Sequence, residues 1–348
     1  MGAIATVMLF AFLVPPAIHL SPLLVAAPTS TAPFARVRFT AGITLAASAA
    51  VVVIDWPDGL LGMPIAPIHV GALLVVSAFV IVARTRHDRD LNELIQVRAV
   101  SEAAQQVLLR PIPTRLGPLR VACSYQAAAA HASVGGDLYA ADRTAGTTRF
   151  LIGDVRGKGL PAIGDASALL AAFRETAHRS ATLAELAASL ESSVRRHLTQ
   201  LDDNAPEADE RFITALLVEI PDDAYVVRLI TCGHPLPLCR HCGRMTVLDG
   251  LRPAPPFGLA GTSPDFYQLG TYVFDPGDTL LLYTDGVTEA RNPATGFYPL
   301  LCRAASWRWE SPPQLLQYVG HDLLAHSDGH FEDDLALVAV QRTLTQQP

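Results

Sequence analysis

Two aspartates beside glycines mark the part of the chain best suited to chemistry. Asp137 directly follows Gly135 and Gly136, and Asp154 stands four residues before the lysine of a second glycine-containing loop. The residues between the two aspartates predict a β-hairpin, whose ends lie side by side. Paired carboxylates next to bare backbone suit a hard divalent cation such as Mg²⁺ or Mn²⁺. The alternative is that both aspartates only stabilise turns, where Asp is common.

The loop after Asp154 contains the only lysine of the chain. All other basic residues among the 26 Lys+Arg are arginines, and Lys158 stands between Gly157 and Gly159. An apolar helix is predicted to begin directly after this loop, with Pro161 in its first turn. A lysine at this position indicates a local requirement. It could attract a phosphate or fix the loop at the start of the helix, and the sequence favours neither role.

Further acids occur in the same context, at the edge of an apolar strand. Asp285 follows the apolar run from Thr279 to Tyr283 and precedes Gly286, and Asp333-Asp334 stand directly before a strand that begins at Leu335. Four converging acids without basic partners would repel one another unless cations neutralised them. Two Mg²⁺ or Mn²⁺ ions, about 3.5–4 Å apart, would do so and could activate a water for attack on phosphorus.

Five motifs in order give the chain a family resemblance over roughly 119–342. It resembles the SpoIIE/RsbU-type branch of the metal-dependent (PPM, type-2C-like) protein serine/threonine phosphatases. The motifs are Val134-Gly135-Gly136-Asp137, Gly153-Asp154-Val155-Arg156-Gly157-Lys158-Gly159, Cys232-Gly233-His234-Pro235, Tyr283-Thr284-Asp285-Gly286 and Asp333-Asp334.

The resemblance implies an α+β fold, in which a central β-sandwich flanked by helices holds a dinuclear Mn²⁺/Mg²⁺ centre. By motif position the metal carboxylates are Asp137, Asp154, Asp285 and Asp333, and Val155 lends its backbone carbonyl. Asp334 is the rival of Asp333 for the last position, because the sequence cannot tell which of two adjacent acids turns inward. Related bacterial enzymes dephosphorylate phosphoserine or phosphothreonine on anti-sigma-factor antagonists. A phosphorylated protein is therefore the expected substrate.

The chain departs from the family pattern at a few positions. Thr231-Cys232 replaces a usual Asn-Ala pair, Arg156 replaces a small residue and Ala336 replaces a threonine. None of these changes removes a metal carboxylate, so catalysis is expected to survive. Two alternatives stay open: a membrane signalling scaffold that uses the phosphatase fold only to bind partners, and a metal phosphohydrolase of small molecules. His234 in its Gly-His-Pro turn is expected to be a structural hydrogen-bonding residue rather than an acid.

The first 83 residues predict a membrane region. Apolar segments near 3–27, 39–54 and 65–83 each approach the ~20 residues that cross a bilayer. The charged residues of this region are only Arg36, Arg38, Asp55 and Asp58. The arginines between the first two segments and those after the third favour a cytoplasmic side for both, by the positive-inside rule. We therefore expect three transmembrane helices within residues 1–83, in a multi-pass protein of the cytoplasmic membrane whose catalytic part is cytoplasmic.

The remainder of the chain divides into a linker helix at 84–110, ended by Pro111 and Pro113, and a phosphatase domain at 111–348. Apolar residues recur along the linker at near-helical spacing, so this helix either forms a homodimer or packs on the domain. The formal net charge of −7 argues against nucleic-acid binding. Cys239 and Cys242 have the spacing of a zinc knuckle, but one such pair without a second is weak support for zinc.

Overall fold

The computed structural model describes residues 37–55, 65–127, 135–144, 146–201, 211–292, 294–331 and 333–343. The chain forms two compact units, residues 1–97 and residues 98–348. The candidate site lies wholly within the second unit.

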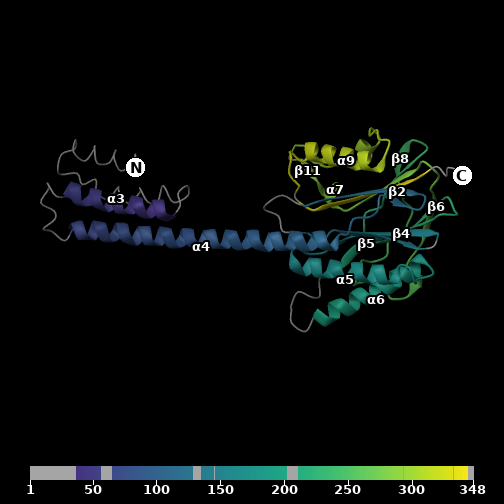
Figure 1. The fold of residues 1–348 in the computed structure, drawn as a ribbon, viewed down its shortest axis with the longest axis horizontal. Helices are drawn as coiled ribbons and strands as arrows, with labels where there is room; N and C mark the ends of the chain where they lie inside the picture. The colour runs from purple at the N-terminus through teal and green to yellow at the C-terminus, as the bar shows by residue number, and fades with distance from the viewer. Residues whose placement is uncertain are drawn as a thin grey trace. The chain divides into compact units, whose positions relative to one another are not determined.

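Helices are the described elements of the first unit. Helix α3 (Val37–Asp55) contains the apolar segment predicted at 39–54, and helix α4 (Ile65–Leu108, blue in Figure 1) begins with the one predicted at 65–83. The segment predicted at 3–27 lies outside the described residues. Within the described ranges, no helix combines the length and the apolar character needed to cross a membrane.

The second unit contains two antiparallel β-sheets. The larger has the strand order β1-β2-β13-β10-β7-β8, and the smaller has the order β3-β4-β5-β6-β9. The strands of the larger sheet are β1 (Arg115–Leu116), β2 (Leu119–Gln126), β13 (Leu335–Arg342), β10 (Thr279–Tyr283), β7 (Leu238–His241) and β8 (Arg244–Val247). Those of the smaller are β3 (Leu138–Thr144), β4 (Thr147–Val155), β5 (Ile213–Pro221), β6 (Val226–Cys232) and β9 (Gly270–Val273).

The alternating pattern of strand residues determines which layers form. Along β13, Ala336 and Val338 enter the core that the larger sheet shares with the smaller one. Leu335 and Leu337 point the other way, into a second core that includes Leu315 of α9. Because successive strand side chains alternate between faces, a strand that is apolar at every position must be covered on both sides. The larger sheet is therefore an inner layer of the sandwich.

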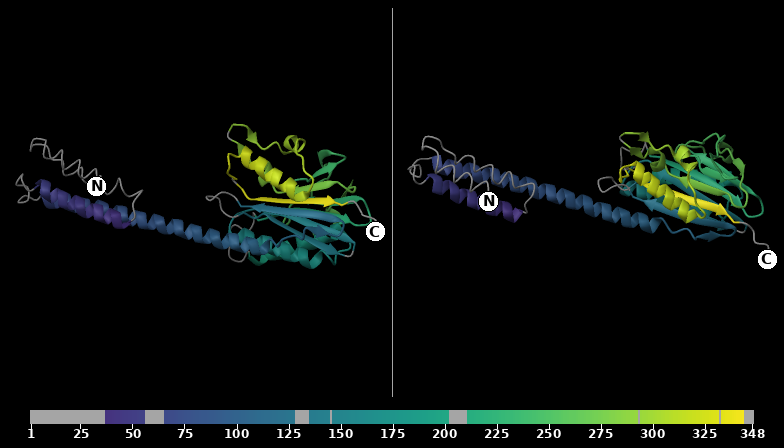
Figure 2. Two further views of the ribbon diagram at one scale, coloured as in Figure 1. Left: turned by 45° about the horizontal axis from the view of Figure 1, so that its top comes forward. Right: turned by 90° about the horizontal axis from the view of Figure 1, so that it is seen from above.

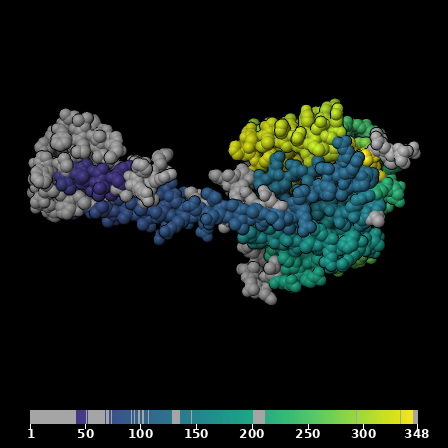
Figure 3. All heavy atoms as spheres, in the orientation of Figure 1, coloured from purple at the N-terminus to yellow at the C-terminus, as the bar shows by residue number. Residues whose placement is uncertain are grey.

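Helices cover the outer faces of both sheets. Helices α5 (Leu160–Thr176) and α6 (Leu183–Leu201) pack against the smaller sheet, and α9 (Pro312–His326) packs against the larger. Figures 1 and 2 show these layers, and in Figure 3 the yellow-green α9 region and the teal helices form opposite outer surfaces of the unit. The short helices α7 (Gly286–Glu289) and α8 (Leu300–Ala304), the 3₁₀ turn η5 (Pro264–Phe266) and the small hairpin β11 (Arg291–Asn292) and β12 (Gly296–Phe297) complete the unit.

The last turns of α4 belong to this second unit. Leu109, just past the helix end, is only 7% exposed and lies in the core. The carbonyl of Leu108 accepts a hydrogen bond from Arg174 Nη2 at 2.9 Å. The C-terminal end of the helix predicted at 84–110 therefore packs on the domain. Packing on the domain was one of the two alternatives for the apolar residues of this helix. The predicted homodimer through 84–110 stays a prediction, as do the predicted domain boundaries.

Most elements match their predicted positions, and the α+β sandwich is confirmed. A capping box begins α6, because Glu185 N–H donates to Thr182 Oγ1 at 3.1 Å and Thr182 N–H donates to Glu185 Oε2 at 3.2 Å. A hairpin turn is expected from the sequence at Cys239–Cys242, and β7 and β8 form a hairpin there. The helices α7 and α8 were not predicted, since four or five residues show little periodicity.

Candidate metal centre

Three aspartates converge at one end of the sandwich. Asp137 directly precedes β3 and Asp154 lies near the end of β4, where the antiparallel pairing of Leu138 with Gly153 holds the two side by side. Asp285 follows β10 and therefore arrives from the other sheet. One ligand oxygen from each of the three carboxylates lies within 4.8 Å of the others. The hairpin predicted between the first two aspartates is confirmed.

Two glycines allow the chain segments to approach this closely. A Cβ on Gly136 would lie 2.7 Å from the carbonyl oxygen of Val155, and one on Gly286 would lie 2.0 Å from the carbonyl oxygen of Asp334. Real Cβ atoms do not tolerate such contacts, so glycine is required at both positions for steric reasons. Any other residue would push apart the segments that carry the aspartates.

Burial and mutual repulsion raise the pKa values of the three carboxyl groups. Burial, followed by the charge of Asp154, holds the pKa of Asp137 well above its usual range. Burial, followed by the charges of Asp285 and Asp333, raises the pKa of Asp154 to about 7. Burial also raises the pKa of Asp285, with Glu289 and Asp333 adding to the effect. Without a cation the cluster therefore favours protonated forms.

Hydrogen bonds from neighbouring segments fix the first aspartate. Thr284 Oγ1 donates to Asp137 Oδ2 at 2.6 Å and accepts from the N–H of Ala336 at 3.0 Å. Gln105 Nε2, from the end of α4, lies 3.4 Å from the carbonyl oxygens of both Gly135 and Asp137. The Asp137 segment is thus connected to β10, β13 and the linker helix.

The two adjacent acids near the C-terminus have different surroundings. Asp334 is buried, and its Oδ2 accepts from Gly135 N–H at 2.8 Å and from the hydroxyl of Tyr125. The Asp333 side chain is 44% exposed, and its Oδ1 lies 3.5 Å from Lys158 Nζ. The charge of Asp333 contributes to the raised pKa values of both Asp154 and Asp285. Asp334 therefore anchors the Gly135 loop, whereas Asp333 faces the cluster and the lysine.

His234 connects the two sheets beside the cluster. Its Nε2 lies 3.1 Å from the carbonyl oxygen of Tyr283, and its Nδ1 lies 3.2 Å from Thr214 Oγ1. Because a carbonyl can only accept, Nε2 carries the proton and Nδ1 accepts from the threonine. Burial lowers the pKa of His234 to about 3, so the ring is neutral at pH 7. Both ring nitrogens are occupied, as expected of a structural residue.

The donor set fits hard divalent cations. The three converging side chains offer only carboxylate oxygens, and the carbonyl oxygen of Val155 lies beside Gly136. Oxygen-only sets of this kind suit Mg²⁺ and Mn²⁺. Of the predicted metal and catalytic residues, the structure brings together Asp137, Asp154 and Asp285, places Asp333 and Lys158 at their edge, and turns Asp334 toward Gly135.

Sequence reasoning did not identify the supporting residues. Thr284 lies between Tyr283 and Asp285 within one of the five family motifs, so its supporting role could have been predicted from the sequence. Gln105 and Tyr125 gave no such signal, since each lies more than 29 positions from the acids that it supports in the fold.

Comparison with known proteins identifies the family of this domain. The sequence model described as Stage II sporulation protein E (SpoIIE) matches residues 144–343, more than half of the chain. The chain belongs to the SpoIIE family. Its phosphatase domain is of the metal-dependent protein serine/threonine class, and the prediction of that class is confirmed. Among curated proteins, Protein IcfG of Synechocystis sp. is 32% identical over 79 residues, which are 22% of this chain but only 12% of that protein.

Solved structures show the same fold. The RsbU and RsbW domains of Rv1364c from Mycobacterium tuberculosis are 26% identical, with a TM-score of 0.50 over 65% of this chain and 60% of that one. The SiaA-PP2C domain of Pseudomonas aeruginosa is 15% identical, with a TM-score of 0.54 over 74% of this chain and 98% of that one. The phosphatase domain and regulatory fragment of SpoIIE from Bacillus subtilis is 16% identical, with a TM-score of 0.51 over 64% and 63%. The SpoIIE-family domain thus spans less than two thirds of the mycobacterial and Bacillus chains.

The repulsion among the carboxylates of Asp137, Asp154 and Asp285 leads to a prediction about the Asp154→Asn variant. The folded-state pKa of Asp154 is raised to about 7, so protonation favours folding. Protonation of Asp154 therefore adds to the free energy of unfolding. The added stability is fully present below the unfolded-state pKa of about 4 and is lost as the pH rises through about 7. At pH 8 without metal, we expect Asp154→Asn to melt higher than the native chain, by about 2–4 °C for each kcal/mol of repulsion relieved.

Thermal melts of the metal-free chain at pH 5 and pH 8 check this prediction. The difference between native chain and variant should shrink at pH 5, and Mn²⁺ should stabilise the native chain more than the variant. Asp223→Asn, at an exposed position, is the matched control and should not change the melting temperature. A variant that melts lower than the native chain at pH 8 would show that other interactions of Asp154 outweigh the repulsion.

Proposed function

We propose that this chain is a membrane-anchored bacterial protein serine/threonine phosphatase with a dinuclear Mn²⁺ or Mg²⁺ centre. The observation that carries the proposal is the convergence of Asp137, Asp154 and Asp285 from three strand ends with oxygen atoms within 4.8 Å. Membership of the SpoIIE family supports the reaction class. A phosphatase fold that only bound partners would gain nothing from keeping three mutually repelling acids.

The metal ligands of the proposed enzyme are the carboxylates of Asp137, Asp154, Asp285 and Asp333 and the backbone carbonyl of Val155. When bound, the cations would supply positive charge for the phosphoryl oxygens and lower the pKa of the attacking water. Asp334 is left out of this set because its carboxylate is already bonded to Gly135 and Tyr125. The hydrogen bond from Thr284 keeps the Asp137 carboxylate in its place.

Lys158 is the residue proposed to attract the phosphate group. Its side chain is 47% exposed and its Nζ lies 3.5 Å from Asp333 Oδ1, at the edge of the carboxylate cluster. A cation there can pair with a phosphate dianion that enters from solvent. His234 is not the proton donor for the leaving serine oxygen, because both its nitrogens are occupied and its pKa is lowered to about 3.

A phosphorylated protein of a partner-switching system is the proposed substrate. The solved mycobacterial relative combines an RsbU domain with an RsbW domain, which supports a role of this kind for related domains. An anti-sigma-factor antagonist carrying phosphoserine or phosphothreonine would fit the proposal. Nucleic acid is not proposed as a partner, in keeping with the net charge of −7.

Anchoring in the cytoplasmic membrane is proposed from the sequence of residues 1–83. Its three apolar segments contain few charges, and arginines flank them on the sides expected to face the cytoplasm. The phosphatase domain would then be cytoplasmic, with a route to homodimers through residues 84–110.

Hydrolysis assays on the full chain in detergent test the phosphatase. Turnover of p-nitrophenyl phosphate and of a phosphoserine peptide should require Mn²⁺ or Mg²⁺ and stop with EDTA. Asp137→Asn and Asp285→Asn should each lose at least about a hundredfold in rate, because several kcal/mol of charge stabilisation depend on the ligand set. Asp223→Asn should retain full rate.

Three outcomes would contradict the proposal. Turnover that survives EDTA or both substitutions would exclude the carboxylate centre. A folded chain without turnover in either metal would favour the scaffold alternative. Faster turnover of small phosphate esters than of phosphoproteins at equal concentration would favour a small-molecule phosphohydrolase.

Lys158→Ala tests the proposed phosphate contact. We expect it to raise the KM for the phosphopeptide and lower kcat/KM by about 5- to 30-fold, equivalent to about 1–2 kcal/mol for one partly exposed charge-assisted contact. Its melting temperature should change little, because the side chain is half exposed. Lys158→Arg should recover part of the activity. Equal losses of activity and melting temperature would assign the lysine to the loop structure instead.

Membrane attachment can be tested with a chain that begins at Arg98, the first residue of the second compact unit. The full chain should sediment with membranes, whereas the shortened chain should stay in the supernatant and scatter light as a monomer. We choose Arg98 rather than Pro111 because Gln105 and Leu109 contact the domain. Sedimentation of the shortened chain would place the anchor elsewhere.

A further inference from the structure

A buried carboxylate near the start of helix α5 binds side chains from two other segments. Asp165 is only 2% exposed. Its Oδ2 accepts a hydrogen bond from Arg211 Nε at 2.9 Å, and its Oδ1 accepts one from Arg211 Nη2. The Nε2 of His197, on α6, lies 3.0 Å from the same Oδ1. Because a bidentate contact between guanidinium and carboxylate is strong and directional, it fixes the start of α5 relative to the chain just before β5.

The chain just before β5 also holds the end of β4. The carbonyl of Phe212 accepts the backbone N–H of Arg156 at 3.0 Å, and the guanidinium of Arg156 lies over the Phe212 ring at 5.1 Å. The pairing of β4 with β5 begins at the next residues. Arg211 therefore adjoins the residue that fixes the beginning of the glycine loop at 156–159.

This glycine loop, which carries Lys158, runs between the two anchored segments. It leaves the end of β4 and enters α5 about one and a half turns before Asp165. Among the residues that the structure describes, none has an atom within 4 Å of a Cβ added to Gly157. The loop is therefore held at its ends rather than by packing at this glycine, and the separation of its ends determines its path.

Apolar packing is unevenly distributed along α5. Its C-terminal half contributes Leu169, Leu170 and Phe173 to the core between helix and sheet, whereas its N-terminal half contributes only Ala162 and Ala166. Stabilisation by burial grows with the apolar area that is buried. The core thus fixes the C-terminal half of the helix, and the half that follows the glycine loop depends more on its carboxylate contacts.

We propose that Asp165 and Arg211 are positioning residues, which hold the glycine loop so that Lys158 stands beside the carboxylate centre. The inference rests on the proposed phosphatase function, in which Lys158 contacts the phosphate. Its Nζ lies 3.5 Å from Asp333 Oδ1. Loss of the pair would let the first turns of α5 move away from β5 and carry the lysine from the centre.

The only lysine of the chain allows a measurement of the loop that does not depend on catalysis. A lysine-specific endopeptidase can cut the chain only after Lys158, and its rate under native conditions reports how often the loop opens. In the full chain in detergent, we expect Asp165→Asn and Arg211→Gln each to be cut at least about tenfold faster than the native chain, because each loses charge-assisted hydrogen bonds. The double variant leaves no unpaired charge and keeps the test valid if a single variant fails to fold.

Two variants on the same helix are matched controls. Glu175→Gln removes an exposed ion pair with Arg179 near the other end of α5 and should be cut at the native rate. Leu169→Ala lowers the melting temperature through the core without changing the pair, and should be cut more slowly than Asp165→Asn. Equal cleavage of the native and Asp165→Asn chains, or faster cleavage of Leu169→Ala, would overturn the proposal.

Activity shows whether the pair acts through the lysine. Asp165→Asn should raise the KM for the phosphopeptide and lower kcat/KM by no more than Lys158→Ala does. Added to Lys158→Ala, it should cause no further fall in kcat/KM, because two changes that act through one contact are not additive. Losses that multiply would overturn the positioning role. A native chain without turnover would contradict the proposed function, whereas the cleavage rates would still decide whether the pair holds the loop.

Discussion

The carboxylates of Asp137, Asp154 and Asp285, with oxygens within 4.8 Å of one another, place the strongest constraint on this fold. At an effective dielectric of about 20, two unit charges at such a distance repel by about 3 kcal/mol. Asp137 precedes β3, Asp154 lies near the end of β4 and Asp285 follows β10, so the repulsion acts to separate strands of two sheets. The buried apolar layers on both sides of the larger sheet oppose that separation. Burial and repulsion together explain why the pKa of Asp154 rises to about 7.

Hydrogen bonds then determine where each carboxylate points. Thr284 connects Asp137 to the backbone of β13, and Asp334 holds the Gly135 loop by accepting its N–H. Gln105 adds a contact from the linker helix to the same loop. Because neighbouring polar groups in one network are energetically coupled, these residues support the centre as a unit. The last turns of α4 are therefore part of the structure that positions the proposed metal ligands.

The sequence identified the residues that carry the chemistry better than those that support it. Asp137, Asp154 and Asp285 could be found because each stands beside glycine at the edge of an apolar strand, a context visible within a few residues. Gln105 could not, because a glutamine on a helix is normally solvated and only the fold buries it. The sequence likewise could not decide which of Asp333 and Asp334 turns toward the carboxylate cluster, since their contacts with Lys158 and Gly135 depend on tertiary structure.

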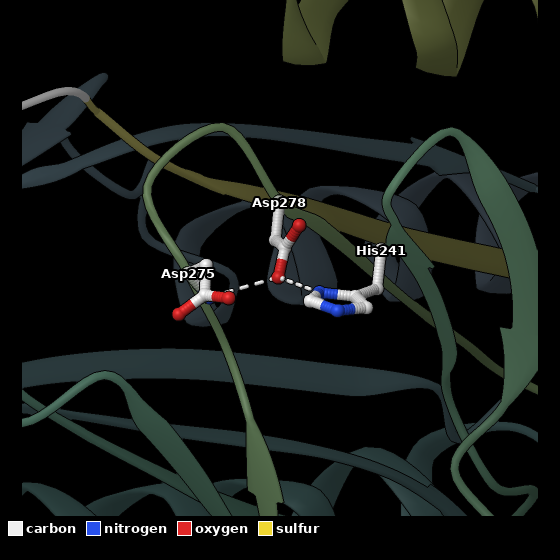
Figure 4. Close-up of side chains that lie close together, drawn as sticks. All are labelled: His241, Asp275 and Asp278. Carbon is white, nitrogen blue, oxygen red and sulfur yellow. Dashed lines mark hydrogen bonds and ion pairs between the residues drawn. The ribbon is translucent and has the colours of Figure 1, made fainter.

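The Cys239–Cys242 pair is the opposite case, in which a local sequence pattern suggested a site that the fold does not form. Its spacing suggested a zinc knuckle, but the strand places Cys239 in the core and leaves Cys242 in the turn beside His241. The spacing alone could not show this, because the face of a strand that a side chain occupies depends on how the strand packs in the sheet. Asp275 and Asp278 lie near His241 only because the β7–β10 pairing brings their turn to the end of β7 (Figure 4). Proximity of this kind, between residues more than thirty positions apart, arises from strand pairing and leaves no local pattern in the sequence.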